Sequence, residues 1–186
     1  MSSKDKTLNE WIKLAEQYTL PDWERLSSIP LYMDQVLLFM SEVFDLFEND
    51  GNAPILTSSM INNYVKNGLV EHPVHKKYNR EHLAKIMMIG MLKQVLSIQE
   101  IALLFSGTED IKAVYAAFTD AQNAAFRDTL ATIESTEKDT DTLRSTALRL
   151  VAEANARRAV AEQILLGISE TPSEASGKAK KNQKNK

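Results

Sequence analysis

Cysteine is absent from this chain of 186 residues. The absence excludes disulfides, thiolate metal ligands and cysteine nucleophiles together, and it is typical of proteins in a reducing interior. No apolar run is long enough to span a bilayer, and the first residues, MSSKDKTLNEW, lack the apolar segment of a secretory signal. We therefore expect a soluble protein of the cytoplasm.

The sequence also lacks the motifs of common catalytic chemistry. It contains no Gly-rich phosphate loop and no nucleophile motif, and acids such as Asp34 and Asp45 lie on the polar faces of amphipathic segments. His72, His75 and His82 have no fourth ligand at a spacing that suits zinc. We interpret them as surface histidines that can charge near neutral pH. We predict no enzymatic activity, no metal and no cofactor.

Charge is distributed unevenly along the chain. Hydrophobic residues at 44% and charged residues at 25% are ordinary values for one sizeable domain or two small ones, and the formal net charge is −3. Residues 21–50 hold seven acids against the single Arg25, whereas residues 57–97 hold six Lys/Arg against Glu71 and Glu81. A partner meets this local field of about +4 rather than the net charge.

Apolar residues recur at helical spacing through most of the chain. Thr57 or Ser58 can cap the start of a short helix, Gly68 suits its left-handed end, Asn79 can cap the next helix, and Ser97 with Glu100 has the spacing of a capping box. We expect helices over residues 8–18, 33–47, 57–67, 80–96, 97–105, 111–134 and 141–168.

The last of these helices has the a/d rhythm of a coiled coil. Its seam is rich in small residues and includes an arginine: Leu143, Ala147, Leu150, Ala154, Arg157, Ala161, Ile164 and Ile168. Packing within a helical bundle and pairing in a homodimer both fit this pattern. The tail 169–186 has no apolar periodicity, so we predict a disordered basic tail.

The segment 57–83 has the pattern of a helix-turn-helix with a small wing. In such modules the recognition helix exposes small polar side chains near its N-terminus, which reach base edges, and buries its other face. A tight exit at Gly68 would let the chain double back through Val70–Val74 as a small wing, and cations that follow the wing would lie against phosphates. The outward side chains of the helix are Ser58, Ser59, Asn62, Asn63 and Lys66, and the cations that follow the wing are Lys76, Lys77 and Arg80.

Three short stretches resemble the MerR-type winged helix-turn-helix family. They are MINNYVKNGLV at 60–70, KKYNREHL at 76–83 and SIQEI at 97–101. The resemblance implies DNA contact at Tyr64, Lys66, Lys76, Lys77 and Tyr78. The chain departs from that family at Asn62, where an arginine is usual, in its shortened wing, and in a Gly-Asn-Ala-Pro insertion before Thr57.

A second resemblance covers residues 20–110. Leu20-Pro21 with Trp23, LYMDQV at 31–36, INNYVK at 61–66 and LKQV at 92–95 resemble an uncharacterised bacterial family of domains of unknown function, number eighteen thirty-six. Its members are regarded as MerR-like and have no established activity.

These observations predict an all-α protein with a MerR-like winged helix-turn-helix. We divide it into an N-terminal helix at 1–19, the winged helix-turn-helix domain at 20–106, a C-terminal helical region at 109–168 that could dimerise, and the tail at 169–186. The predicted function is a DNA-binding transcriptional regulator that contacts double-stranded DNA. The alternative is a protein-interaction module, adaptor or antirepressor-like, that keeps the winged-helix shape without reading DNA.

Overall fold

The computed structural model describes residues 7–48, 54–134 and 139–170, and these are almost entirely helical. Within these ranges the chain forms no β-strand, only isolated bridges, so the all-α prediction is confirmed. No helix of the described ranges is long and apolar enough to cross a membrane. The elements are α1 (Leu8–Glu16), a 3-10 turn η2 (Trp23–Arg25), α2 (Met33–Phe44), α3 (Ser58–Lys66), α4 (Arg80–Leu92), α5 (Ile98–Phe105), α6 (Ile111–Glu134) and α7 (Thr140–Glu170).

Local side-chain chemistry sets both ends of α3, as the sequence predicts. The Thr57 hydroxyl accepts a hydrogen bond from the Met60 amide at 3.2 Å, which satisfies one of the free donors of the first turn. At the other end Gly68 adopts φ 71°, and Leu69 donates its amide to the Tyr64 carbonyl at 2.9 Å. This is a Schellman motif, whose left-handed residue favours glycine.

The helices α2 and α4 both end earlier than their apolar periodicity predicts. In α2 the Phe47 and Glu48 amides both bond the Phe44 carbonyl, and in α4 the Val95 amide bonds the Leu92 carbonyl at 2.9 Å. Bonds from residue i+3 to residue i tighten the chain into a turn and stop helix propagation.

The core joins α2, α3, α4, α5 and the first half of α6. Val36, Ile61, Met87, Ile101 and Tyr115, one from each of these helices, all have an exposed fraction of 0% and belong to the same buried cluster. Eight of the thirteen residues of α4 are buried, which makes it the central helix. The core therefore extends into α6, beyond residue 106, the predicted end of the domain.

Gly90 allows α2 and α4 to approach closely. A Cβ at this position would lie 2.7 Å from Cζ of the Phe44 ring and 3.2 Å from Leu56. Phe44 is 1% exposed, so its ring has little room to move away. The glycine is thus required by packing rather than by a special backbone angle.

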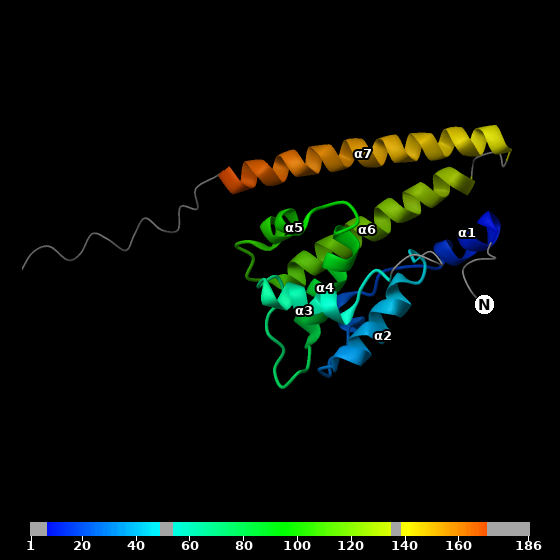
Figure 1. Cartoon of the computed structure of the whole chain (residues 1–186). Coiled ribbons are helices and arrows are strands. Elements are labelled where there is room, and N and C mark those ends of the chain that lie inside the picture. Colours follow the sequence, from blue (N-terminus) through cyan, green and yellow to red (C-terminus); the bar gives the residue numbers. More distant parts are fainter. Residues whose placement is uncertain (1–6, 49–53, 135–138, 171–186) are drawn as a thin grey trace, which may run out of the picture.

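The two terminal helices lie on the outside of this core. In α1, Ile12 and Ala15 are buried, and the ring of Trp11 meets Phe126 of α6 edge-on at 6.3 Å. Figure 1 shows α7 along one edge of the molecule and α2 with the α3–α4 loop at the opposite edge. Leu165 of α7 is buried, whereas Leu148 and Val151 are exposed. The predicted disordered tail lies outside the described residues, except for its first two positions, which end α7.

The predicted a/d seam of α7 faces an open apolar groove. The groove has a volume of about 620 Å³ and runs between α7 and the ends of α4 and α5. Seam residues Leu150, Ala154, Ala161 and Ile164 line it, together with Leu104 from α5.

Candidate nucleic-acid interface

The polar side chains predicted on α3 share one exposed face. Ser58, Ser59, Asn62, Asn63 and Lys66 are all exposed, since positions four apart on a helix lie on the same side. The opposite face is buried in the core through Ile61, Tyr64 and Val65. A nine-residue helix thus presents hydroxyl, amide and ammonium groups while the other face anchors it.

Tyr64 and Tyr78, which the MerR resemblance places at DNA, are buried in the structure. Their exposed fractions are 6% and 3%, and burial raises the pKa of both phenols. Tyr64 belongs to the apolar face of α3, and the Tyr78 ring packs edge-on against His82 at 5.6 Å. Both rings belong to the core, and the other predicted residues are exposed except Lys77 and Arg80, which are half-buried.

The turn between α3 and α4 is a two-residue hairpin. Val74 and Lys77 form an antiparallel bridge, and the Lys77 amide donates to the Val74 carbonyl at 3.0 Å. The residues between them, His75 and Lys76, have φ values of 52° and 64°. Positive φ at both central positions is the signature of a type I′ turn, which normally uses Asn-Gly or similar pairs. Here a histidine and a lysine occupy these conformations.

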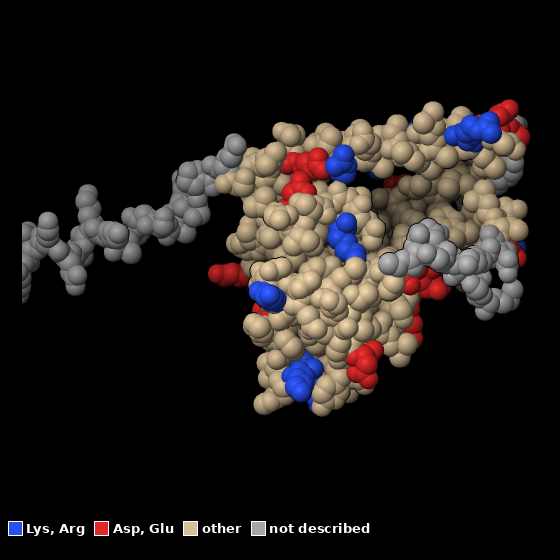
Figure 2. Space-filling view, viewed as in Figure 1, with Lys and Arg blue, Asp and Glu red and all other residues tan. Residues whose placement is uncertain are grey.

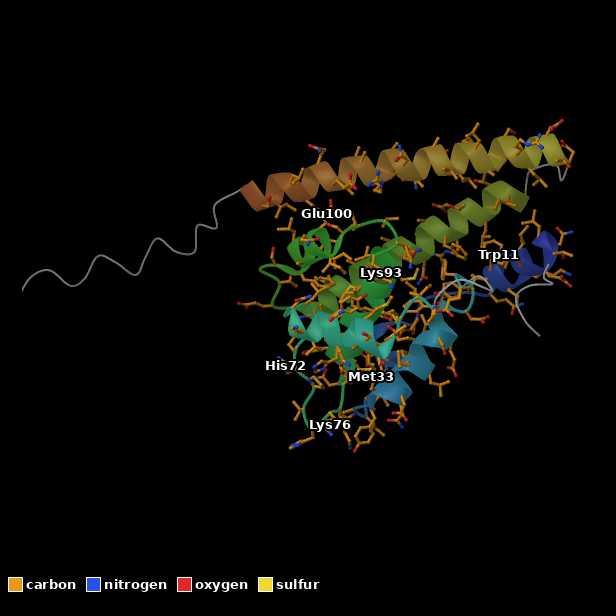
Figure 3. All side chains as sticks on the ribbon, viewed as in Figure 1. Trp11, Met33, His72, Lys76, Lys93 and Glu100 are labelled. Atoms are coloured by element: carbon orange, nitrogen blue, oxygen red, sulfur yellow. The ribbon has the colours of Figure 1, made fainter. Side chains whose placement is uncertain are left out.

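The base of this hairpin is tied to the segment before α2. Leu31 and Tyr78 form a second antiparallel bridge, with amide-to-carbonyl distances of 2.9 and 2.8 Å in the two directions. The ammonium of Lys77 lies 4.9 Å from the centre of the Tyr32 ring, in a cation–π contact. The tip is free of such support, and Figure 3 shows Lys76 projecting from the body at the end furthest from α7.

Two carboxylates pair with three cations near the hairpin. Arg80 pairs with Glu24 at 3.2 Å, and Lys112 of α6 pairs with the same carboxylate at 2.9 Å. The hydrogen bond from Lys112, followed by the charges of Lys112 and Arg80, lowers the pKa of Glu24. Lys85 pairs with Glu71. The predicted DNA contact at Arg80 therefore competes with an internal partner.

Outside the ion pairs of the described residues, segment 57–97 has two exposed cations, Lys66 and Lys76, and a half-buried one, Lys77, at the edge of the hairpin. The sixth cation, Lys93, is half-buried and donates to the Ile55 carbonyl. Figure 2 shows separate basic side chains over α3 and the hairpin and separate acidic side chains along α2. The positive charge that the sequence predicts for this segment is therefore carried at the surface by fewer side chains than the six cations of the sequence.

His82 differs from its interpretation as a surface histidine. It is 5% exposed, and its Nδ1 accepts a hydrogen bond from the Asn79 amide at 3.1 Å, which closes a capping box at the start of α4. His72 and His75 are exposed. No group of three His, Asp or Glu residues in the described ranges is arranged to hold a metal ion.

The ion pairs with Glu24 and Glu71 had no signal in the sequence. Arg80 and Glu24 are 56 residues apart in sequence, and Lys85 and Glu71 are 14 apart, on different elements. Only the folded arrangement of η2, the hairpin and α4 brings these charges together. A helical spacing rule of three or four residues cannot find such pairs.

Comparison with known proteins gives one match. No curated protein and no solved structure matches the chain. The family described as Domain of unknown function (DUF1836) matches residues 21–122, which run from the start of the η2 segment into α6 and include α3 and the hairpin. Because this match covers more than half of the 186 residues, the chain belongs to the DUF1836 family.

Proposed function

We propose that this protein is a DNA-binding transcriptional regulator in which α2, α3, the hairpin and α4 act as a MerR-like winged helix-turn-helix. In this proposal α3 is the recognition helix and the hairpin at 74–77 is the wing. The exposed polar face of α3, the cations that follow it and the resemblance of residues 60–83 to MerR-type proteins support the assignment.

The observation that carries the proposal is the conformation of His75 and Lys76. A left-handed conformation costs a residue with a side chain about 1–2 kcal/mol. Residues held in such conformations cluster at functional sites. Here the strained pair holds an exposed lysine at the tip of a projecting turn. A cation in that place can contact a phosphate beside the groove that α3 enters.

The dimensions of α3 suit the major groove. An α-helix with its side chains is about 10–12 Å across, and the major groove is about 12 Å wide, so α3 can enter it. The N-terminal part of a recognition helix makes the base contacts, and in α3 this part exposes Ser58, Ser59 and Asn62. Asparagine can bond adenine through both its amide atoms.

Selection of duplexes from a random-sequence pool tests sequence reading. We expect an enriched site, and we expect Asn62→Ala or Asn63→Ala to weaken its binding by about 1–3 kcal/mol while binding to random duplex stays unchanged. Asn67→Ala is the matched control, because Asn67 is exposed at the far end of the helix. A pool that yields no enriched sequence would contradict sequence-specific reading.

A homodimer through α7 would give such a regulator two recognition helices. The groove beside α7 is open, and Val160, Ile164 and Ile168 are exposed on this helix. A second α7 could cover these apolar side chains, and two-fold pairing sets the spacing of DNA half-sites. Sedimentation of the wild-type chain and of Ile164→Glu tests this: the wild type should be dimeric and the variant monomeric.

The second candidate is a protein-interaction module. It is favoured because Arg80 and Lys85 pair with Glu24 and Glu71 within the chain, and because Asn62 stands where MerR-type proteins carry an arginine. Affinity purification distinguishes the two functions. A stoichiometric protein partner that is retained without nucleic acid would favour the interaction module, whereas co-purifying DNA that is released by salt would favour the regulator.

A further inference from the structure

A pocket of about 570 Å³ opens at the start of α3, on a different part of the surface from the polar face of this helix. Its walls come from the end of α2, the segment before α3, the C-terminal end of α4 and the middle of α6. The volume lies within the range of small-molecule sites, about 300–1,000 Å³. Apolar side chains of Phe47, Met60, Met91 and Phe118 form much of the lining.

Lys93 brings a positive charge into this apolar lining. Its ammonium donates to the Ile55 carbonyl and lies 3.4 Å from the Met60 sulfur. It takes part in none of the ion pairs of the described residues. Burial lowers the pKa of this lysine, since the surroundings solvate its charge poorly. An ammonium has three N–H donors, so one remains for a further acceptor.

Glu48, the one acidic residue among the described lining residues, does not neutralise Lys93. One oxygen of its carboxylate accepts the Ile55 amide at 2.8 Å. Glu48 and Lys93 therefore bind the two backbone groups of the same residue, the amide and the carbonyl. This arrangement holds Ile55 in place, and no described residue gives the cation an anionic partner beside the apolar pocket. Figure 3 shows Lys93 in the middle of the body, far from Lys76.

We propose that this pocket binds an amphipathic monocarboxylate, with its carboxylate on Lys93 and its apolar body against Met60, Met91 and Phe118. An anionic head supplies an acceptor of opposite charge, which no described residue provides, and a buried charge is stabilised once it is paired and hydrogen-bonded. An apolar body removes the lining methionines and aromatic ring from water. This proposal does not depend on DNA binding, although Met60 belongs both to the pocket lining and to the first turn of α3.

Methionine-methyl NMR of the full chain tests the pocket directly, with decanoate as the probe. In a chain labelled at the methionine ε-methyl carbons, decanoate should shift the signals of Met60 and Met91. The signal of Met33, which does not line the pocket, should not shift. Lys93→Met should raise the Kd at least about tenfold, because it removes a charge-assisted bond. Lys13→Met, which removes an exposed lysine of α1, is the matched control and should bind as the wild type does.

Head-group chemistry tests the role of Lys93 without any variant. Decanol and decylammonium carry the same chain as decanoate with a neutral and a cationic head, and both should bind the wild-type chain at least about tenfold more weakly. Equal binding of all three would reduce the site to an apolar surface, and tighter binding of decylammonium would assign the anchor to Glu48. Either result would overturn the proposal. It would also be overturned if decanoate did not shift the Met60 and Met91 signals.

Discussion

The strained hairpin makes a prediction that separates stability from DNA binding. His75 and Lys76 occupy the two left-handed positions of a type I′ turn, where asparagine and glycine are preferred. Replacing His75 by Asn, or Lys76 by Gly, puts a preferred residue into the same backbone. Neither replacement removes a hydrogen bond, because the bond that closes the turn joins the Lys77 amide to the Val74 carbonyl.

The expected gain follows from two opposing terms. A side chain in the left-handed region costs about 1–2 kcal/mol, and glycine relieves this cost. Glycine also makes the unfolded chain more flexible, which takes back about 0.5–1 kcal/mol. Lys76→Gly should therefore stabilise the protein by about 0.5–1 kcal/mol, and His75→Asn by a similar or smaller amount. A chain of this length gains about 2–4 °C in Tm per kcal/mol.

Urea unfolding followed by circular dichroism, together with DNA titration, gives both readouts. His75→Asn should be more stable and bind DNA as the wild type does. Lys76→Gly should also be more stable, but it should lose about one unit of salt dependence because it loses one phosphate contact. His72→Asn is the matched control, since this exposed residue is not among those with positive φ, and its effect should stay within about 0.5 kcal/mol.

Two outcomes would refute this reasoning. If Lys76→Gly and His75→Asn change the free energy of unfolding no more than His72→Asn does, the hairpin stores no strain. If Lys76→Gly is stabilised and its DNA binding is unchanged, the strain exists but does not serve a phosphate contact.

The remaining predictions concern the scaffold. The Tyr115 hydroxyl donates a hydrogen bond to the Pro21 carbonyl at 2.6 Å. Tyr115→Phe removes this donor, so it should lower the free energy of unfolding by about 1–3 kcal/mol, measured by urea unfolding. Gly90→Ala should cost about 1–3 kcal/mol although alanine favours helix, since its Cβ would meet the Phe44 ring at 2.7 Å, and a gain in Tm would contradict the packing argument. Burial alone would raise the pKa of Glu71, but the hydrogen bond from Lys85 holds this pKa below its ordinary value of 4.5. The ion pair therefore stabilises the fold above pH 4.5, and this contribution is lost as the pH falls further. Lys85→Met should therefore lose about 0.2–1 kcal/mol at pH 7 and little at pH about 3, measured by urea unfolding at both values.

Elements whose signals lie within a few residues could be predicted from the sequence. The N-cap at Thr57 and the glycine at Gly68 define α3, and the Ser97–Glu100 capping box starts α5. Helix α6 has the predicted bounds, 111–134. Caps and apolar periodicity depend on neighbours three or four residues away, so tertiary structure changes them little.

The candidate site was only partly predictable, because its electrostatics depend on distant pairs. The polar face of α3 follows from helical spacing, and it is exposed as predicted. The burial of Tyr78 depends on its bridge to Leu31, and the loss of Arg80 as a free cation depends on Glu24. A tyrosine or an arginine looks the same in sequence whether its partner is solvent, DNA or another segment of the chain.

Binding of the purified chain to random-sequence duplex DNA, measured by fluorescence anisotropy across a salt series, tests the central claim most directly. The charge-reversal variant Lys76→Glu/Lys77→Glu is compared with Lys13→Glu/Arg127→Glu, which makes the same charge change at exposed positions on α1 and α6. We predict that log affinity falls linearly with log salt, that the hairpin variant binds more weakly with a slope shallower by about two units, and that the control keeps the wild-type slope. No binding at low salt, or an equal loss in both variants, would contradict the assignment of the hairpin as a phosphate-contacting wing.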